Sequence, residues 1–198
     1  MLIGLIRHGL TDWNAVGRIQ GQSDIPLNEE GRRQARLLAD HLKNEQEPHW
    51  DFVITSGLSR AQETGSILAD ALGIPLLDPD SRIVERSFGQ VEGLTSTERE
   101  ARWGKDWILQ DLGQETEGQL RSRALSFLEE MKKKYGDNHV LVVSHGALLA
   151  QMYEALFPQQ CTERIGNLSL TILENQTAEW KLNLYNCTRH LEYASKEN

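Results

Sequence analysis

Hydrophobic residues in this chain occur either in short continuous runs or in longer periodic stretches. Continuous apolar runs bounded by charged or turn residues are typical of strands buried on both faces of a sheet. Such runs cover residues 2–6, 51–55, 74–77 and 140–143. Near the end, residues 168–173 and 180–184 are predicted to pair as two more strands across residues 174–178.

The periodic stretches predict helices between these strands. Asn28 is a favourable N-cap before two acidic residues, and apolar residues then repeat on one helical face as far as Leu42. Comparable patterns run from Ala61 to Leu72, from Gln119 to Tyr135 and from Ala147 to Leu156. The polar segment 92–118 is expected to hold an irregular helix that covers part of the molecule.

Strands that alternate with helices predict an α/β fold, here a three-layer α/β/α sandwich with a mostly parallel central sheet. The chain has 198 residues, of which 39% are hydrophobic, so it can bury a sizeable core and has the length of one large domain. Neither an internal repeat nor a linker interrupts it. We therefore expect a single domain over residues 1–198.

The charge of the chain restricts its partners. The formal net charge is −8, and no basic cluster is interleaved with aromatic residues. Both observations argue against a nucleic-acid partner. A small anionic substrate would instead need a local pocket of arginine and histidine side chains.

Membrane and redox signals point to a cytoplasmic protein. The first apolar run, residues 1–6, is too short for a signal-peptide core, and no later apolar stretch approaches the roughly 20 residues of a membrane span. Cys161 and Cys187 lack metal-binding or redox spacing and cannot form a disulfide framework. We expect reduced thiols and no membrane partner, and the sequence leaves the oligomeric state open.

Candidate chemistry lies directly after three of the predicted strands. In open α/β sheets the ligand crevice lies beyond the carboxyl ends of the strands, so residues at those ends are expected to meet on one rim. They are Arg7, His8 and Gly9 after the first strand, Ser56 and Arg60 after the second, and Ser144, His145 and Gly146 after strand 140–143.

The two His-Gly pairs and the two arginines suit phosphoryl chemistry. Either histidine alone would be interpreted as a hydrogen-bonded, partly buried side chain, but two at equivalent positions favour a functional role. A neutral imidazole can attack phosphorus when a backbone carbonyl binds its other ring nitrogen. Arginine binds two phosphoryl oxygens at once, and each charge-assisted bond contributes about 1.5–3 kcal/mol.

These residues also carry a resemblance to a known family. Residues Leu5–Asn14 resemble the Arg-His-Gly-x-Thr-x-x-Asn signature of the histidine phosphatase superfamily, in the branch that includes cofactor-dependent phosphoglycerate mutases. Five further segments of the chain are similar to other family blocks, in the same order. They are Gly21–Gly31, Ser56–Thr64, Val143–Gly146, and the shorter Asn167–Ser169 with Arg189–Leu191.

The resemblance implies roles for individual residues. It implies that His8 is phosphorylated and that Arg7, Arg60 and His145 bind the phosphoryl group. It also implies polar or backbone contacts at the pocket edge, from Asn14, Gln20, Gly21 and Gly146. Glu85 matches the family's acid, which protonates the leaving oxygen and later activates water, work worth about 10²- to 10⁴-fold in rate. The implied reaction needs neither a metal nor an organic cofactor.

Four other kinds of protein are alternatives to this interpretation. A metallohydrolase could use the two histidines, but no close-spaced ligand pair such as HExxH occurs, and Arg7 and Arg60 would repel a cation. An acyl hydrolase lacks its GxSxG elbow, and a nucleotide-binding enzyme lacks its glycine-rich loop. A phosphate-binding regulatory protein that has lost activity stays open, and an assay with an aryl phosphate separates it from an enzyme.

Within the family, the sequence favours a phosphatase over a mutase. A mutase must shield its phosphoenzyme from water, which takes additional closing elements. The segment between Glu85 and His145 is shorter than in mutases, and Ser87–Gly93 resembles the phosphatase version of that block. One departure is Gly113–Thr116, where the family often has Gly-Glu-Ser. The expected substrate is a small phosphorylated metabolite, with phosphoserine, α-ribazole phosphate, phosphoglycerate and broad phosphomonoester use all open.

Overall fold

The computed structural model of the protein describes residues 1–45, 48–175 and 179–193, which include a five-stranded sheet in the order β2-β3-β1-β4-β5. The strands are β1 Leu2–Arg7, β2 Phe52–Thr55, β3 His139–Ser144, β4 Leu170–Asn175 and β5 Trp180–Cys187. β1, β2 and β3 are parallel, whereas β4 and β5 are antiparallel to their neighbours. Arg7 pairs with Ser144, so the carboxyl ends of β1 and β3 lie side by side.

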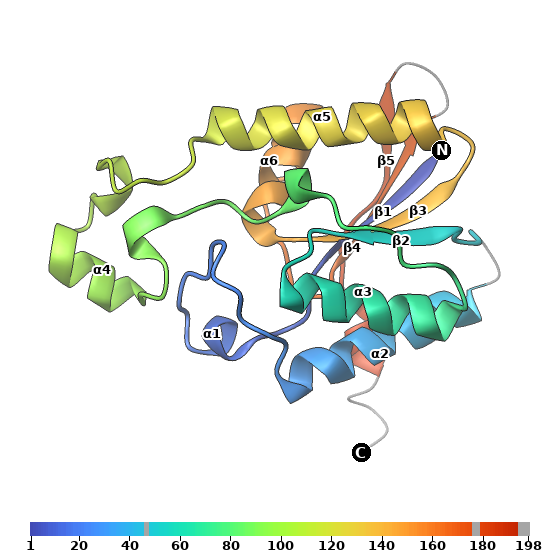
Figure 1. The fold of residues 1–198 in the computed structure, drawn as a ribbon, viewed down its shortest axis with the longest axis horizontal. Coiled ribbons are helices and arrows are strands. Elements are labelled where there is room, and N and C mark those ends of the chain that lie inside the picture. Colours follow the sequence, from blue (N-terminus) through green and yellow to red (C-terminus); the bar gives the residue numbers. More distant parts are fainter. Residues whose placement is uncertain (46–47, 176–178, 194–198) are drawn as a thin grey trace.

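Helices cover both faces of this sheet (Figure 1). The helices are α1 Asp12–Ala15, α2 Glu29–Asn44, α3 Ser59–Leu72, α4 Ser96–Trp103, α5 Glu117–Tyr135, α6 Gly146–Leu156 and α7 Arg189–Tyr193, with short 3₁₀ turns at Ser81–Ile83, Gly89–Val91 and Trp107–Leu109. α2 and α3 pack on one face, and α5 and α6 on the other. Within the described part of the chain, none of the helices has both the length and the apolar character to span a membrane.

The continuous apolar runs follow from this two-sided cover. Successive side chains of a strand point to opposite faces, so a strand between two helix layers needs apolar residues at every position. In β1, Ile3 and Leu5 join the core beneath α5 and α6, whereas Ile6 joins the core beneath α2 and α3. The predicted three-layer α/β/α sandwich with a mostly parallel central sheet is confirmed.

Capping residues determine where the long helices begin. The Asn28 side chain accepts a hydrogen bond from the Gly31 backbone N–H at 2.9 Å, as its predicted N-cap role requires. Thr116 and Gln119 form a reciprocal capping box, so α5 begins at Glu117 rather than at the predicted Gln119. α3 ends at Gly73, whose φ of 67° is the left-handed conformation that suits glycine.

Two strand predictions need correction. Residues 74–77 form a single bridge, between Val53 and Leu76, rather than a strand, because Pro75 has no N–H to donate and only the Pro75 carbonyl and the Leu77 N–H bind Val53. The strand predicted at 168–173 begins only at Leu170, since Leu168 has a φ of 53°. Its partner extends to Cys187, and residues 176–178 of the expected connection lie outside the described residues.

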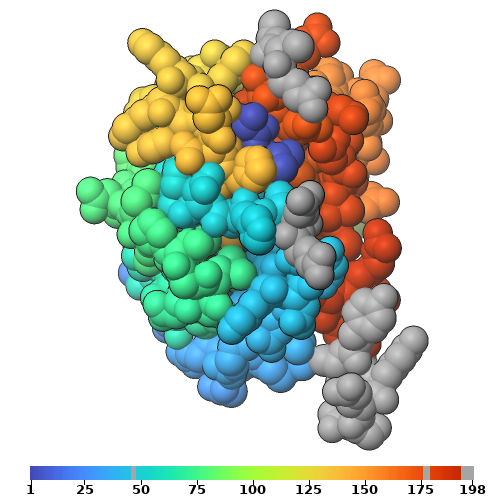
Figure 2. All heavy atoms as spheres, turned by 90° about the vertical axis from the view of Figure 1, so that its right-hand side faces the viewer, coloured from blue at the N-terminus to red at the C-terminus, as the bar shows by residue number. Residues whose placement is uncertain are grey.

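The segment 92–118 lies beyond the carboxyl ends of the parallel strands. It holds α4 and a 3₁₀ turn, in agreement with the expected irregular helix, and it projects on the left in Figure 1. Figure 2 shows the opposite side of the molecule, which includes the amino ends of the parallel strands β1, β2 and β3. The two ends of the sheet therefore differ, because one is surrounded by long loops and the other by helix ends.

Candidate active site

A pocket of about 360 Å³ lies at the carboxyl ends of β1 and β3. Most of the residues expected at the site line it, and they come from segments far apart in the sequence. They are Arg7, His8, Asn14, Gln20, Gly21, Arg60, Glu85 and Gly146. His145 is the exception, because it is fully buried and does not line the pocket.

His8 is held as a neutral imidazole with one nitrogen available. Its Nδ1 lies 2.7 Å from the Gly9 carbonyl oxygen, which can only accept, so Nδ1 carries the proton and Nε2 carries the lone pair. Burial lowers the pKa of His8 well below its usual range, and the charges of Arg7 and Arg60 lower it further, against the hydrogen bond to Gly9. The ring is only 2% exposed, so its orientation is fixed.

Close backbone approach explains the glycine that follows His8. A Cβ on Gly9 would lie 2.7 Å from the Gly31 carbonyl oxygen, and a Cβ on Gly31 would lie 2.1 Å from the Leu10 carbonyl oxygen. The loop after β1 therefore packs directly against the first turn of α2. This contact leaves no room for side chains at either position.

The guanidinium groups of Arg7 and Arg60 are oriented by hydrogen bonds to backbone carbonyls. Arg7 donates to the Ile165 carbonyl at 2.7 Å, and Arg60 donates to the Ser23 and Gly21 carbonyls at 2.8 and 2.7 Å. Burial lowers the pKa of Arg7 to about 10 and lowers that of Arg60, although the nearby Glu85 raises both. Neutral acceptors orient the two guanidinium groups without cancelling their charge.

His145 lies behind His8, with the two ring centroids 5.1 Å apart. Its Nε2 lies 2.7 Å from the Ser56 hydroxyl oxygen, and that oxygen accepts a hydrogen bond from the Leu58 N–H at 3.4 Å. With Ser56 donating its proton to Nε2, the neutral His145 carries its own proton on Nδ1. Burial, followed by the proximity of His8 and the charges of Arg60 and Arg7, lowers the pKa of His145 well below its usual range.

Three buried nitrogen atoms around His8 have no hydrogen-bond partner in the described part of the chain. They are Nε of Arg7, Nε of Arg60 and Nδ1 of His145. An unpaired buried N–H costs roughly 1–3 kcal/mol, so three such groups beside one pocket are candidates for binding an acceptor from a ligand. The acceptor that suits two guanidinium N–H groups and an imidazole N–H is an anion with several oxygens.

Glu85 extends into the same pocket from the segment after the 3₁₀ turn Ser81–Ile83. Its carboxylate accepts hydrogen bonds from the N–H groups of Ala147 and Leu148, both at 3.2 Å, in the first turn of α6, and from its neighbour Arg86 at 2.8 Å. The first-turn N–H groups of α6 and the Arg86 N–H thus fix the position of this carboxyl group. The segment after β3 therefore carries His145 and also orients Glu85.

The expected edge residues form the pocket wall in different ways. Gln20 accepts a hydrogen bond from the Thr11 hydroxyl at 2.9 Å, and Asn14 accepts one from Asn167 at 3.3 Å. Gly21 has a φ of 53°. A Cβ on Gly146 would lie 3.3 Å from Nε of Arg7, so glycine keeps the pocket floor open there.

Sequence reasoning missed Glu92, which holds the loop that binds Arg60. The Glu92 carboxylate accepts from the backbone N–H groups of Gln22, Ser23 and Phe88 at 2.9–3.1 Å, and from the Ser23 hydroxyl at 2.8 Å. The loop carbonyls of Gly21 and Ser23 then bind Arg60. No local pattern marks one acid among 29 for this role, because all these contacts join distant segments.

Sequence reasoning also missed a brace behind Glu85 and a charged rim beside Arg7. Arg123 forms an ion pair of 2.7 Å with Glu115 and donates to three backbone carbonyls, those of Arg82, Val84 and Glu85. Residues 113–116 are where the sequence differs from the family pattern. In this segment Glu115 belongs to the brace and does not line the pocket. The rim residues Glu163 and Arg164 line the pocket from the loop before β4.

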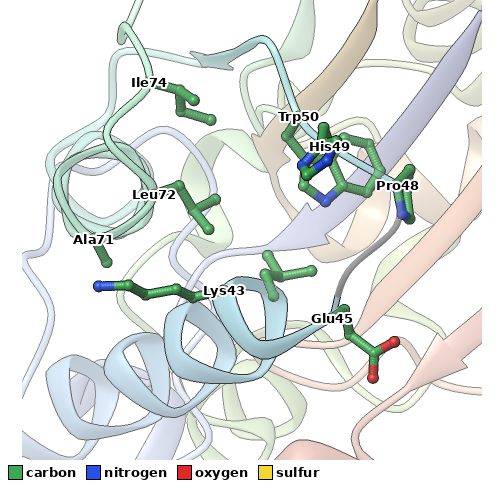
Figure 3. A pocket seen from close by; sticks show the side chains of 9 residues that line it. Lys43, Glu45, Pro48, His49, Trp50, Ala71, Leu72 and Ile74 are labelled. Carbon is green, nitrogen blue, oxygen red and sulfur yellow. The ribbon is translucent and has the colours of Figure 1, made fainter.

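A second hollow, of about 630 Å³, lies at the opposite end of the sheet (Figure 3). The ends of α2 and α3 form one side, with Lys43, Leu72 and Ile74, and the segment before β2 forms the other, with His49 and Trp50. It contains none of the residues that the sequence singled out. The candidate active site is therefore the smaller pocket around His8.

Over the ranges 1–45, 48–175 and 179–193, no three His, Cys, Asp or Glu side chains are arranged so that they could hold a metal ion. Around His8 the charged neighbours are guanidinium groups rather than further ligands.

Comparison with known proteins finds relatives that match most of the chain. The chain is 34% identical over 190 residues to the uncharacterized phosphatase PhoE of Bacillus subtilis, covering 94% of this chain and 95% of that protein. It is 32% identical to a metal-independent phosphoserine phosphatase of Arabidopsis thaliana, covering 96% and 82%. It is also 35% identical to a probable phosphoglycerate mutase, GpmB, of Yersinia pestis, covering 89% and 86%.

A solved structure shares the fold, and a family model matches nearly the whole chain. The structure of Bacillus stearothermophilus YhfR superposes with a TM-score of 0.85 at 26% identity, covering 96% of this chain and 98% of that one. Residues 3–188 match the model of the histidine phosphatase superfamily (branch 1). The relatives include phosphatases and phosphoglycerate mutase-like proteins. The chain therefore belongs to branch 1 of the histidine phosphatase superfamily.

Proposed function

We propose that this protein is a phosphatase that hydrolyses small phosphomonoesters through a phosphohistidine on His8, without a metal ion. The observation that carries the proposal is the set of three unpartnered buried nitrogens of Arg7, Arg60 and His145 around the neutral His8. Phosphatases among the homologues support a phosphoric monoester hydrolase.

In the first step, the phosphoryl group of the substrate provides the acceptor oxygens that the three unpartnered nitrogens lack. Nε of Arg7, Nε of Arg60 and the Nδ1–H of His145 bind its oxygens, and they stabilise the charge that spreads over them in the transition state. Nε2 of His8 attacks phosphorus while the bond to the leaving oxygen breaks. Protonated Glu85 gives its proton to that oxygen, so the alcohol leaves neutral and Glu85 becomes a carboxylate.

In the second step, water replaces the alcohol. The Glu85 carboxylate takes a proton from water as the water oxygen attacks the phosphorus of phosphohistidine. The P–N bond breaks, inorganic phosphate forms, and His8 and protonated Glu85 are restored. The hydrogen bonds from Ala147 and Leu148 hold the carboxylate in position for this step.

A metal ion has no role in this scheme, because Arg7 and Arg60 supply the positive charge that a cation would otherwise contribute. The polar edge formed by Asn14, Gln20, Gly21 and Gly146 surrounds the phosphoryl group and limits its orientation. The partner implied is a small phosphorylated metabolite, since the pocket has a volume of about 360 Å³.

The assay that tests the proposal measures phosphate release from a panel of phosphomonoesters, including 4-nitrophenyl phosphate, with isomerisation of 3-phosphoglycerate followed alongside. We expect phosphate release that survives a chelator and that disappears in His8→Ala but not in His49→Ala, a histidine in the second hollow. Formation of 2-phosphoglycerate faster than free phosphate would show a mutase instead. Absence of turnover with every ester would favour a phosphate-binding protein.

A further inference from the structure

The rim of the pocket includes a loop segment, residues 163–165, whose backbone is fixed at every position. Each of its three carbonyl oxygens accepts a hydrogen bond from a side chain. In order, the donors are Tyr185 at 3.4 Å, Asn186 at 3.1 Å and Arg7 at 2.7 Å. The segment is therefore bound both to β5 and to the Arg7 guanidinium group. Its side chains extend from a backbone of fixed position.

Charged side chains elsewhere in the pocket are engaged with protein groups. Arg18 pairs with Glu98 at 2.8 Å, and Glu85 accepts from the first turn of α6. The side chains of Glu163 and Arg164 also line the pocket and are exposed, yet neither has a hydrogen bond or ion pair with any residue in the described ranges. The rim thus presents one negative and one positive group that the protein does not use internally.

The position of Arg164 links this rim to the phosphoryl site. Its charge is one of the causes that lower the pKa of Arg7, together with burial, so the two guanidinium groups lie close together. A guanidinium binds a carboxylate through two parallel N–H···O bonds, whereas a glutamate carboxylate accepts from an ammonium group. A ligand with a carboxylate alone would bind Arg164 but would also face the negative charge of Glu163.

We propose that Glu163 and Arg164 form a subsite for the ammonium and carboxylate groups of the substrate, which is an O-phosphorylated α-amino acid. Arg164 binds the carboxylate and Glu163 binds the ammonium while the phosphate lies against His8. This inference rests on the proposed phosphatase function and assigns a substrate class to it. The two opposite charges at one rim favour a zwitterion over a phosphorylated hydroxy acid, because only the zwitterion satisfies both.

The test compares kcat/KM for three esters that differ in these two groups. O-phosphoserine has both, phosphoethanolamine lacks the carboxylate, and 3-phosphoglycerate lacks the ammonium; 4-nitrophenyl phosphate reports on the phosphoryl site alone. The variants are Arg164→Gln and Glu163→Gln. Arg36→Gln and Glu129→Gln, on exposed faces of α2 and α5, are matched controls for the change in net charge.

We expect the wild type to prefer O-phosphoserine over both partial analogues by about tenfold or more. Arg164→Gln should lower kcat/KM for O-phosphoserine and 3-phosphoglycerate by about tenfold. Its kcat/KM for phosphoethanolamine should stay within about twofold of the wild-type value. Glu163→Gln should lower it for O-phosphoserine and phosphoethanolamine and spare 3-phosphoglycerate. The control variants and the aryl phosphate should change little.

Other outcomes separate failure of this inference from failure of the proposed function. If both rim variants change all esters equally, or if phosphoethanolamine or 3-phosphoglycerate is the best wild-type substrate, the zwitterion subsite is wrong although the protein is a phosphatase. If even 4-nitrophenyl phosphate is not hydrolysed, the phosphatase proposal itself fails.

Discussion

His8 and Glu85 line one pocket but have different surroundings. Burial, together with the charges of Arg7 and Arg60, keeps the His8 imidazole neutral, whereas Glu85 lies at the start of α6 and accepts backbone hydrogen bonds. In the proposed reaction, the neutral ring attacks phosphorus and the carboxyl group moves the proton. The two residues should therefore respond differently to changes in the substrate.

Glu85→Gln tests the proton-transfer role. The amide keeps the size of the side chain but cannot donate a proton to the leaving oxygen. We expect kcat/KM for an alkyl phosphate, whose leaving group needs that proton, to fall about 10²-fold or more, and for 4-nitrophenyl phosphate to fall far less. Steady-state phosphate release measures both.

The control is Glu129→Gln, an exposed residue on α5, which should leave both substrates unchanged. Equal losses of kcat/KM for good and poor leaving groups in Glu85→Gln would remove Glu85 from the acid role.

At the level of single residues, the sequence could predict those that directly follow strands. His8, Arg60 and His145 occupy the carboxyl end of the sheet because strand ends meet there, a relation that holds for any open α/β sheet. Glu85 was found only through the family resemblance, since it lies in a loop without periodicity. The rim pair Glu163 and Arg164 could not be found, because β5 and Arg7, distant in sequence, hold that loop.

At the level of elements, a brace from α5 positions the segment that carries Glu85. The guanidinium group of Arg123 donates to the carbonyls of Arg82, Val84 and Glu85, and it pairs with Glu115. Burial alone would raise the pKa of Glu115, but Arg123, the Ser87 N–H and the charge of Arg86 together outweigh burial, and the pKa is lowered. The side chains of Arg123 and Glu115 are only 18% and 14% exposed, so their pairing is largely shielded from solvent.

Arg123→Met should therefore affect both stability and turnover. It removes one donor from three carbonyls and from a largely buried carboxylate, which we expect to lower the free energy of unfolding by about 2–4 kcal/mol. Because Glu85 would lose its fixed position, kcat should fall about tenfold or more with little change in KM. Urea denaturation and steady-state kinetics measure the two effects.

Arg121→Met is the matched control, on the same helix, where Arg121 donates to Gln151 at 2.9 Å and does not contact the Glu85 segment. A drop in kcat of the same size in Arg121→Met, or none in Arg123→Met, would contradict the positioning role.

Strand predictions are correct where burial on both faces determines the element, and they are wrong where backbone hydrogen bonding determines it. The strands at residues 2–6 and 140–143 were recognised because helices cover both of their faces. Residues 74–77 have the same apolar character, but Pro75 limits them to one bridge. Composition does not show which backbone groups remain free to pair, so such segments are overestimated as strands.

At the level of the whole molecule, buried histidines make stability depend on pH. His190 stacks on His41 with ring centroids 5.9 Å apart, and burial, then the proximity of His41, lowers the pKa of His190 to about 4. His8 and His145 shift in the same direction. Between pH 6.5 and about 4 the unfolded chain binds protons that the folded chain does not, so stability falls as the pH falls.

His190→Gln tests this relation without touching the active site. Between pH 7.0 and 5.5 the free energy of unfolding of the wild type should decrease, and the decrease should be smaller in His190→Gln by about 1 kcal/mol per pH unit. Urea unfolding at both pH values measures it. An equal decrease in both proteins would show that His190 is protonated in the folded state.

The three-layer architecture could be predicted from the sequence because alternating apolar runs and amphipathic stretches have few packed solutions. The arrangement of the pocket rim could not, since it depends on where the long loops after Glu85 and before β4 settle. In the proposed function, the loops determine substrate choice, whereas the phosphoryl group binds at the carboxyl end of the sheet.

The central claim is that the His8 imidazole accepts phosphorus directly. The most direct measurement incubates the protein with ³²P-labelled phosphomonoester, quenches it within milliseconds and tests the stability of the bound label. We predict label that is lost in acid, survives alkali, maps to His8, is absent in His8→Ala and is retained in His49→Ala. An unlabelled wild type that still releases phosphate, or label that persists in His8→Ala, would contradict the account.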